Sequence, residues 1–205
     1  MRTLEPDASV DSDHPDIVAF AARHRADTPR QTAIRLFLAV RDGLRYNPYR
    51  VSLRREDYVA SRILARDPQL GGHCIDKALI LAAAARASGI PARLHFANVR
   101  NHLGTAKLEE KLGTDLLVFH GYAELELDGR WVAATPAFNR ELCERLGVAP
   151  LEFDGVNDAI FQEYGPNGRF MEYVHDHGSF DTLPFDEMIA EWRRHYARMP
   201  DTWGD

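Results

Sequence analysis

A run of alanine and leucine in the middle of the chain restricts the fold more than any other feature of the sequence. Residues 74–87 combine high helix propensity with apolar side chains on nearly every face, and glycines precede and follow them at Gly71-Gly72 and Gly89. A helix that is apolar all round has to be enclosed by other elements. The sequence therefore predicts a central, buried helix on which the rest of the chain packs.

Cys74 begins this helix. At a helix N-terminus, unpaired backbone N–H groups and the positive end of the helix dipole favour a thiolate over a thiol. Two interpretations of the position follow: a nucleophile, or a small buried residue on a core helix. The helix taken alone does not decide between them.

The segments before the central helix have helical periodicity. Apolar residues recur at helical spacing from about residue 15, and Thr28-Pro29 indicates a second helix start, with Thr as N-cap and Pro at the first helical position. A third helix is predicted over residues 53–66. The loop 67–72 then leads to Cys74.

After the central helix, the periodicity changes to that of strands. Residues 92–99 and 116–127 predict two strands, and Asp128-Gly129 is a strong hairpin signal before a return strand. Shorter strand-like stretches follow at 159–164 and 170–175, and an amphipathic helix is predicted over 184–199. The order predicts an α+β domain, with an antiparallel sheet packed on the central helix and with N-terminal and C-terminal helices.

Size, charge and cysteine content narrow the class of protein. The 205 residues fit a single domain, 1–205, with residues 1–13 as a flexible acidic lead-in. A formal charge of −6 does not indicate binding to nucleic acid or to an anionic membrane. The longest apolar run, 78–85, is too short to span a bilayer, and the N-terminus lacks the apolar region of a signal peptide. With only two cysteines, we expect a cytoplasmic protein without a disulfide framework.

A nucleophilic Cys74 would need a histidine as its base, and nine histidines compete for that role. His120 differs from the others because it lies inside an alternating strand pattern, and the adjacent Gly121 allows close backbone approach. The alternative interpretation of His120 is a hydrogen-bonded core residue.

Together these segments resemble the transglutaminase-like superfamily, whose members share a papain-like cysteine catalytic core. The resemblance covers roughly residues 30–140 and rests on four motifs: Gly72-His73-Cys74, Ala87-Ser88-Gly89-Ile90-Pro91-Ala92-Arg93, His120-Gly121-Tyr122-Ala123-Glu124 and Asp128-Gly129-Arg130-Trp131. In that family the Cys opens a buried helix and the His begins the following strand. The resemblance implies that Cys74 is the nucleophile and His120 the general base.

The third catalytic position departs from the family pattern. Where the family places Asp before a proline, this chain has Thr135 before Pro136. A threonine hydroxyl can accept a hydrogen bond from imidazole but carries no charge to stabilise an imidazolium. Asn139 is the second candidate for orienting His120, by similarity to the Asn of papain-like enzymes.

An oxyanion hole completes the expected site. The backbone N–H of Cys74 is one donor. Gln69, five residues before Cys74, resembles the Gln of papain-like enzymes, and Tyr58 and Tyr46 are further candidates. We expect no cofactor and no metal, because the sequence has neither a Cys-x-x-Cys pair nor a His-Glu-x-x-His motif.

The resulting hypothesis is cysteine-dependent acyl transfer or hydrolysis at an amide or ester, on a peptide, protein or small amide substrate. The acyl group would pass from Cys74 to water or to an amine, and the sequence does not choose between them. The alternative is a catalytically weak or inactive module that keeps the fold and binds a peptide or partner in the cleft. A thiol redox protein is less consistent with the sequence, because no second cysteine lies near Cys74.

Overall fold

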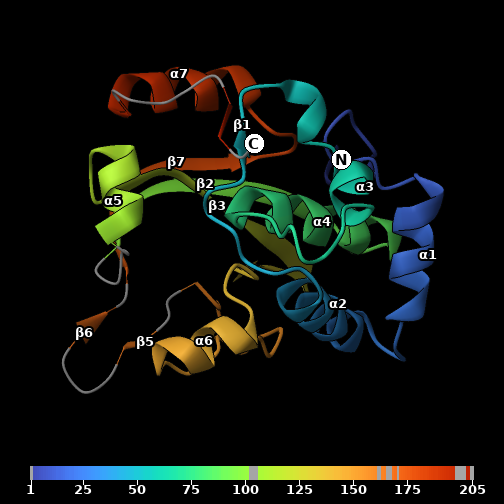
Figure 1. The fold of residues 1–205 in the computed structure, drawn as a ribbon. Coiled ribbons are helices and arrows are strands. Elements are labelled where there is room, and N and C mark those ends of the chain that lie inside the picture. The colour runs from blue at the N-terminus through green and yellow to red at the C-terminus, as the bar shows by residue number, and fades with distance from the viewer. Residues whose placement is uncertain are drawn as a thin grey trace.

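The computed structural model describes residues 2–101, 106–160, 163–164, 168–169, 171–196 and 202–203. Its centre is a four-stranded antiparallel sheet in the order β4-β3-β2-β7 (Figure 1). The strands are β2 (Ala92–Asn101), β3 (Leu116–Leu127), β4 (Arg130–Ala134) and β7 (Met171–Phe180). The turn between β3 and β4 has positive φ at both central residues, Asp128 at 51° and Gly129 at 76°, as the hairpin signal requires.

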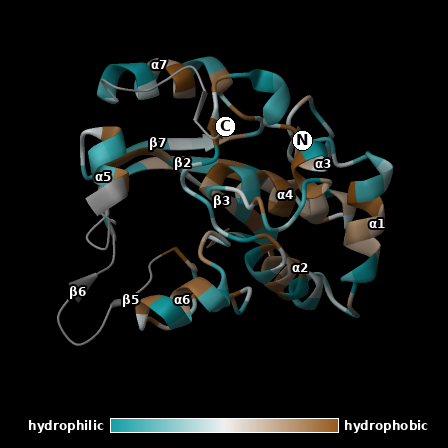
Figure 2. Cartoon of the chain, viewed as in Figure 1, coloured by the Kyte–Doolittle hydropathy of each residue, from teal (hydrophilic) through white to brown (hydrophobic). Residues whose placement is uncertain are grey.

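The central helix α4 (Cys74–Ala87) packs against β3 and β2, and almost all of it is buried. Figure 1 shows α4 lying on the sheet with α2 on its other side, and Figure 2 shows its hydrophobic character. The predicted class is therefore confirmed: an α+β fold with an antiparallel sheet on a buried helix that begins at Cys74. The helix starts at the predicted residue because glycines and a capping residue precede it, and it ends before the αL glycine Gly89 (φ 76°).

Three helices enclose the rest of α4: α1 (Pro15–Arg23), α2 (Pro29–Gly43) and α3 (Ala60–Leu64). Thr28 caps α2 as predicted, since its side chain accepts a hydrogen bond from the Gln31 N–H at 3.2 Å. The helix predicted over 53–66 is wrong in extent. Within that range only a 3₁₀ turn, η2 (Arg55–Asp57), and the short α3 form. The Tyr58 hydroxyl donates to the Ser52 carbonyl instead, at 2.9 Å, which folds this segment back on itself.

The remaining elements lie around this core. They are η1 (Arg2–Leu4), β1 (Val51–Ser52), α5 (Ala106–Leu112), α6 (Arg140–Leu146), β5 (Glu163–Tyr164), β6 (Gly168–Arg169), α7 (Phe185–His195) and β8 (Thr202–Trp203). β1 pairs with β8, and β5 pairs with β6. Two predicted boundaries shift: the strand expected at 170–175 continues to Phe180 as β7, and the final helix ends at His195. Phe170, residues 161–162 and residues 197–199 of these predictions lie outside the described residues.

The acidic lead-in is packed on the domain. Val10 is fully buried, and Ser9 and Ser12 are nearly so. The buried guanidinium of Arg86, on α4, donates to the Glu5 carbonyl at 2.7 Å and pairs with Asp7 at 3.2 Å. The structure thus places the lead-in against the C-terminal end of the central helix; the flexibility expected for it stays a prediction.

A buried lysine joins the central helix to two other segments. Lys77 is completely buried, and its ammonium donates to the carbonyls of Arg41, Leu44 and Ala137, each at 2.8 Å. Burial lowers the pKa of Lys77 to about 7, and the three carbonyls supply acceptors for the protons that its nitrogen carries. Lys77 thereby fixes the end of α2 and the chain just after Thr135 to the first turn of α4.

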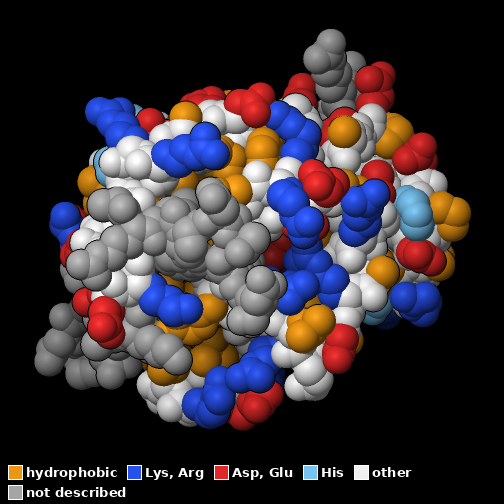
Figure 3. Space-filling view, turned by 45° about the horizontal axis from the view of Figure 1, so that its top comes forward, with side chains coloured by type: hydrophobic (Ala, Val, Ile, Leu, Met, Phe, Trp, Pro, Cys, Tyr) orange, Lys and Arg blue, Asp and Glu red, His pale blue; other side chains and the backbone are white. Residues whose placement is uncertain are grey.

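The surface is mixed in character. Basic, acidic and apolar side chains are interspersed over the face shown in Figure 3. Among the residues that the structure describes, no helix combines the length and apolar character needed to cross a membrane.

Candidate active site

Cys74 lies in the first turn of α4, and the loop that precedes it is held by backbone hydrogen bonds. The Gly72 N–H donates to the Arg45 carbonyl, and the Asn47 N–H donates to the Gly72 carbonyl, both at 2.9 Å. Gly71 adopts φ 71°, and a Cβ there would collide with the Arg45 carbonyl, so glycine is required. This pairing places the segment around Tyr46 beside the start of the helix.

His73 is the N-cap of α4. Its Nδ1 accepts from the Ile75 N–H at 3.1 Å, and the Asp76 carboxylate accepts from the His73 N–H at 3.1 Å, which completes a capping box. Burial lowers the pKa of His73, so its imidazole is neutral at neutral pH. Although it adjoins Cys74 in sequence, its lone pair is occupied, and it serves as a cap.

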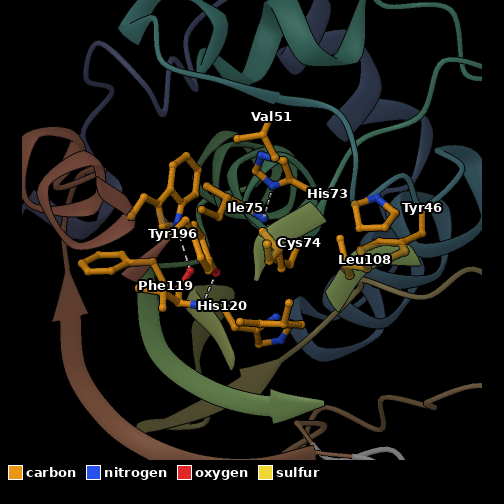
Figure 4. Close-up of a pocket in the computed structure, with 14 residues that line it drawn as sticks. Tyr46, Val51, His73, Cys74, Ile75, Leu108, Phe119, His120 and Tyr196 are labelled. Atoms are coloured by element: carbon orange, nitrogen blue, oxygen red, sulfur yellow. Dashed lines mark hydrogen bonds between the residues drawn. The ribbon is translucent and has the colours of Figure 1, made fainter. Parts of the chain in front are cut away.

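Cys74 and His120 line the same pocket, between α4, β3, α5 and the end of α7 (Figure 4). Strand β4 ends at Ala134, which pairs with Ala123 of β3. The β3 residues that precede Ala123 in the chain therefore have no strand partner on that side among the described residues. There the backbone N–H of Gly121 reaches the Cys74 sulfur and favours its thiolate. A Cβ on Gly121 would lie 2.9 Å from the Phe96 ring and 3.1 Å from Ile75, so the predicted need for close approach is met.

A bulge in β3 sets the position of His120. The register between β2 and β3 shifts between Ala97, opposite His120, and Val99, opposite Leu117. Phe119, just before His120, adopts φ 59°, an unusual conformation for a bulky residue. Asn98 supports it by accepting the Phe119 N–H on its side-chain oxygen at 3.0 Å, in a buried position.

Burial shifts both candidate catalytic groups toward their neutral forms. It raises the pKa of the Cys74 thiol to about 11, against the opposing effect of the Gly121 and Ile75 N–H groups. It lowers the pKa of His120 to about 4, with a further contribution from His73. At neutral pH the site therefore holds a thiol and an uncharged imidazole rather than an ion pair.

The two residues expected to orient His120 are close to the site but do not bond to it. Thr135 is buried, and continuing the β3–β4 register by one residue places it opposite Tyr122, on the same sheet face as His120. The two ring nitrogens of His120 and the Thr135 hydroxyl all lack a hydrogen-bond partner among the described residues. Asn139 accepts from the Tyr46 N–H at 3.0 Å. The orienting roles of Thr135 and Asn139 stay predictions.

The expected oxyanion residues are placed unequally. Gln69 is exposed in a turn and does not line the pocket. Tyr58 is buried behind it, with its hydroxyl on Ser52 and 3.4 Å from His73 Nε2. Tyr46 does line the pocket. Burial and the nearby Cys74 hold the pKa of the Tyr46 phenol well above its usual value, so it is a hydrogen-bond donor at neutral pH.

Tyr46 lines the pocket, whereas the sequence offers it only as a further oxyanion candidate. It lies 28 positions before Cys74 in a segment of no regular periodicity, and only its parallel bridge to Gly72 brings it to the helix start. The Asn47-Pro48 dipeptide that follows it is a local turn signal, and it carries no information about a tertiary partner. Among the described residues, no three His, Cys, Asp or Glu side chains are grouped so as to hold a metal ion.

The chain is similar in sequence to one protein family and, over part of its length, in fold to a solved structure. A sequence profile of the Transglutaminase-like superfamily matches residues 18–136, more than half of the chain and including Cys74, His120 and Thr135. A solved structure from Cytophaga hutchinsonii, described as that of a candidate cysteine protease, aligns with a TM-score of 0.48 and 18% identity. That alignment covers 66% of this chain and 40% of the other, so this chain spans less than half of that protein's length. No curated protein matches the sequence.

Proposed function

Because this chain belongs to the transglutaminase-like superfamily, we propose that it transfers or hydrolyses acyl groups at an amide or ester through a thioester on Cys74. The observation that carries the proposal is the shared pocket of Cys74 and His120, with the Gly121 N–H on the sulfur. A nucleophile at a helix start and a histidine on the adjoining strand are the two groups that thiol acyl transfer needs.

The pKa shifts leave both groups uncharged before attack, so the proton has to move while the carbon–sulfur bond forms. As the sulfur bonds to the substrate carbonyl carbon, the thiol proton passes to a neutral His120 nitrogen. When the tetrahedral intermediate collapses, the bond to the leaving group breaks and His120 returns that proton to it. Water or an amine then attacks the thioester, and His120 accepts a proton from the attacker. The carbon–sulfur bond breaks, and His120 returns the proton to the sulfur, which restores the thiol. His120 enters the reaction unprotonated because burial keeps its imidazole neutral at neutral pH, although the same burial weakens it as a base.

Stabilisation of the oxyanion is assigned to the start of the helix and to Tyr46. The Cys74 N–H is a backbone donor at the N-terminus of α4, where the helix dipole favours negative charge. The Tyr46 phenol, which faces the pocket and keeps its proton at neutral pH, is the side-chain donor. Tyr46 takes the place that the sequence analysis gave to Gln69.

The test is to trap the acyl-enzyme by mass spectrometry with a panel of activated esters and amides, and to measure alkylation by iodoacetamide. We expect one adduct on Cys74, and its loss in Cys74→Ala. Cys143→Ala is the matched control, because Cys143 is fully buried in the core beside Ala97 and Val99. Labelling that persisted in Cys74→Ala would contradict the proposal.

A second candidate, a non-catalytic binding module, is favoured by the burial of His120 and the raised pKa of Cys74. It predicts a thiol that stays inert to iodoacetamide between pH 6 and 8, and equal peptide binding by the wild type and Cys74→Ala. Alkylation of Cys74 in this pH range with acyl turnover would exclude it.

A further inference from the structure

The chemistry of the pocket walls indicates which acyl group the site accepts. We propose that the acyl group carried by Cys74 is a short, uncharged and apolar aliphatic chain. The inference rests on the proposed function, because it concerns the group bound at the same sulfur.

The walls beside Cys74 are aliphatic and aromatic. Val51 of β1, Leu108 and Leu112 of α5 and Leu117 of β3 contribute apolar side chains. None of the residues that line the pocket in the described part of the chain is Lys, Arg, Asp or Glu. The acyl chain beyond the reacting carbonyl would therefore contact hydrocarbon.

The polar atoms of the surrounding aromatic residues are already used within the protein. Trp192 Nε1 donates to the Val118 carbonyl at 2.8 Å, and the Val118 N–H donates to the Tyr196 hydroxyl at 2.6 Å (Figure 4). These bonds fix the rings against the bulge of β3, so Trp192 and Tyr196 present mainly carbon to the pocket. His73 is likewise engaged through Nδ1.

The remaining polar groups belong to the chemistry at the carbonyl. They are the Cys74 thiol, the unpartnered nitrogens of His120 and the Tyr46 phenol. A carboxylate or ammonium farther along the acyl chain would be removed from water without an ion-pair partner on the walls, which is strongly unfavourable. The described walls carry no charged side chain, so the pocket disfavours a charged acyl group.

The size of the cavity limits the length of the chain. Its volume is about 60 Å³. A cavity of this size holds only a few water molecules. An aliphatic chain with a similar number of heavy atoms fills this space and releases that water, which favours binding by about fourfold for each buried methylene.

The experiment compares acylation of the wild-type chain by 4-nitrophenyl acetate, butyrate, pentanoate, hexanoate and decanoate, and by the 4-nitrophenyl monoester of succinic acid. Succinyl resembles pentanoyl in length but ends in a carboxylate. Acyl-Cys74 is measured by mass spectrometry and nitrophenol release by absorbance. We expect kcat/KM to peak between butyrate and hexanoate and to be on the order of a hundredfold lower for the succinate.

A wall variant and a matched control locate the effect. Leu108→Ala removes three carbons from the pocket wall and should move the optimum toward longer chains, with decanoate gaining about tenfold over butyrate. Leu183→Ala removes the same atoms from an equally buried leucine that does not line the pocket, and should leave the chain-length profile unchanged.

The possible outcomes separate failure of the inference from failure of the proposed function. Efficient acylation of Cys74 with no discrimination between pentanoate and succinate would overturn the inference and leave the proposed function standing. A profile that shifted equally in Leu108→Ala and Leu183→Ala would also overturn it. Absence of acylation by every ester, with Cys74 inert to iodoacetamide, would overturn the proposed function and the inference with it.

Discussion

Two histidines on one face of one sheet have opposite surroundings. His120 on β3 lies opposite Ala97 on β2, and His95, two residues before Ala97, lies opposite Tyr122. By this register both side chains point to the same side of the sheet. His120 is 1% exposed with both ring nitrogens unpartnered among the described residues, whereas His95 is surrounded by polar side chains.

The group around His95 is a closed network. Its Nε2 lies 2.8 Å from Asp176, and its Nδ1 lies 2.9 Å from the Ser179 hydroxyl, which donates to Glu124 at 2.7 Å. Arg93 pairs with the same carboxylate at 2.5 Å. Although burial acts in the opposite direction, Glu124 and Asp176 raise the pKa of His95. Burial by itself would raise the pKa of Glu124, but the hydrogen bonds from His95, Ser179 and Arg93 lower it to about 2.

The comparison separates a structural histidine from a candidate catalytic one. His95 has its partners, including the carboxylate that would stabilise an imidazolium, and it lies away from the cysteine. His120 shares a pocket with Cys74 and lacks that carboxylate, because Thr135 stands where the family has Asp. His120 is the candidate base because it is unprotonated at neutral pH and lines the same pocket as the cysteine.

The largest expected effect comes from replacing each histidine in turn. His120→Asn removes the proposed base and should lower the rate of Cys74 acylation by about 10²–10⁴-fold. His95→Gln should change that rate by less than about threefold, because it lies outside the pocket. Stopped-flow measurement of nitrophenol release, with thermal unfolding as a check on folding, gives both values. Equal losses in the two variants would contradict the assignment of His120.

Asn98 contacts both regions, and we expect its replacement to have the next largest effect. Its side-chain oxygen accepts from the Phe119 N–H and from His177 Nε2 at 2.8 Å. Asn98→Ala leaves the buried N–H without a partner and should lower the free energy of unfolding by about 2 kcal/mol. Urea denaturation measures it. Asn98→Asp keeps the acceptor and should lose less; an alanine variant as stable as wild type would show that the bulge needs no such support.

Thr135→Asp gives His120 the kind of partner that His95 has. A carboxylate on the same sheet face should raise the pKa of His120 by about 1–3 units and increase alkylation of Cys74 at pH 7 by about tenfold. NMR titration of the imidazole and iodoacetamide kinetics measure the two changes. Thr135→Asn is the uncharged control. An unchanged pKa in the Asp variant would place Thr135 out of reach of His120.

The smallest effect is expected in the His95 network. The pKa of Glu124 is lowered to about 2 from an ordinary 4.5, so its stabilisation is present above pH 4.5 and is lost as pH falls toward 2. For His95, whose pKa is raised, stabilisation is present below pH 6.5 and is lost as pH rises through the folded-state pKa. Glu124→Gln should cost about 1 kcal/mol at pH 6 by urea denaturation, after allowance for solvent screening.

Glu126→Gln, two residues along the same strand, is the control for that measurement. Its stability curve between pH 2 and 5 should run parallel to that of the wild type, whereas the curve of Glu124→Gln should be flatter. A Glu124→Gln curve as steep as the wild type would mean that other carboxylates carry the acid sensitivity.

Elements defined by local patterns were predicted closely. The central helix, the turn at Asp128-Gly129 and the capped start at Thr28 follow from side-chain periodicity and from hydrogen bonds between residues a few positions apart. The helix over 53–66 was wrong because Tyr58 bonds to Ser52 and no capping residue begins a helix there. β7 was predicted too short because its pairing with β2, far away in the chain, sustains it through Gly178.

The candidate site divides in the same way. Cys74 and His120 could be identified from the sequence because each begins or lies in a well-patterned element, and the resemblance paired them. Tyr46 could not be ranked, because its place beside Cys74 depends on a bridge to Gly72. The missing contact between Thr135 and His120 could not be foreseen either, since it depends on how the chain leaves β4.

What the sequence by itself determined is the local placement of the candidate groups: a cysteine at the start of a helix too apolar to be exposed, and a histidine on the second strand after it. What only the tertiary structure decided is their state. Burial beside Leu117, Phe119 and Trp192 keeps the His120 imidazole and the Cys74 thiol neutral, while carboxylates from β3 and β7 raise the pKa of His95. Protonation depends on water and charge within a few ångströms, and those neighbours come from segments that are distant in the chain.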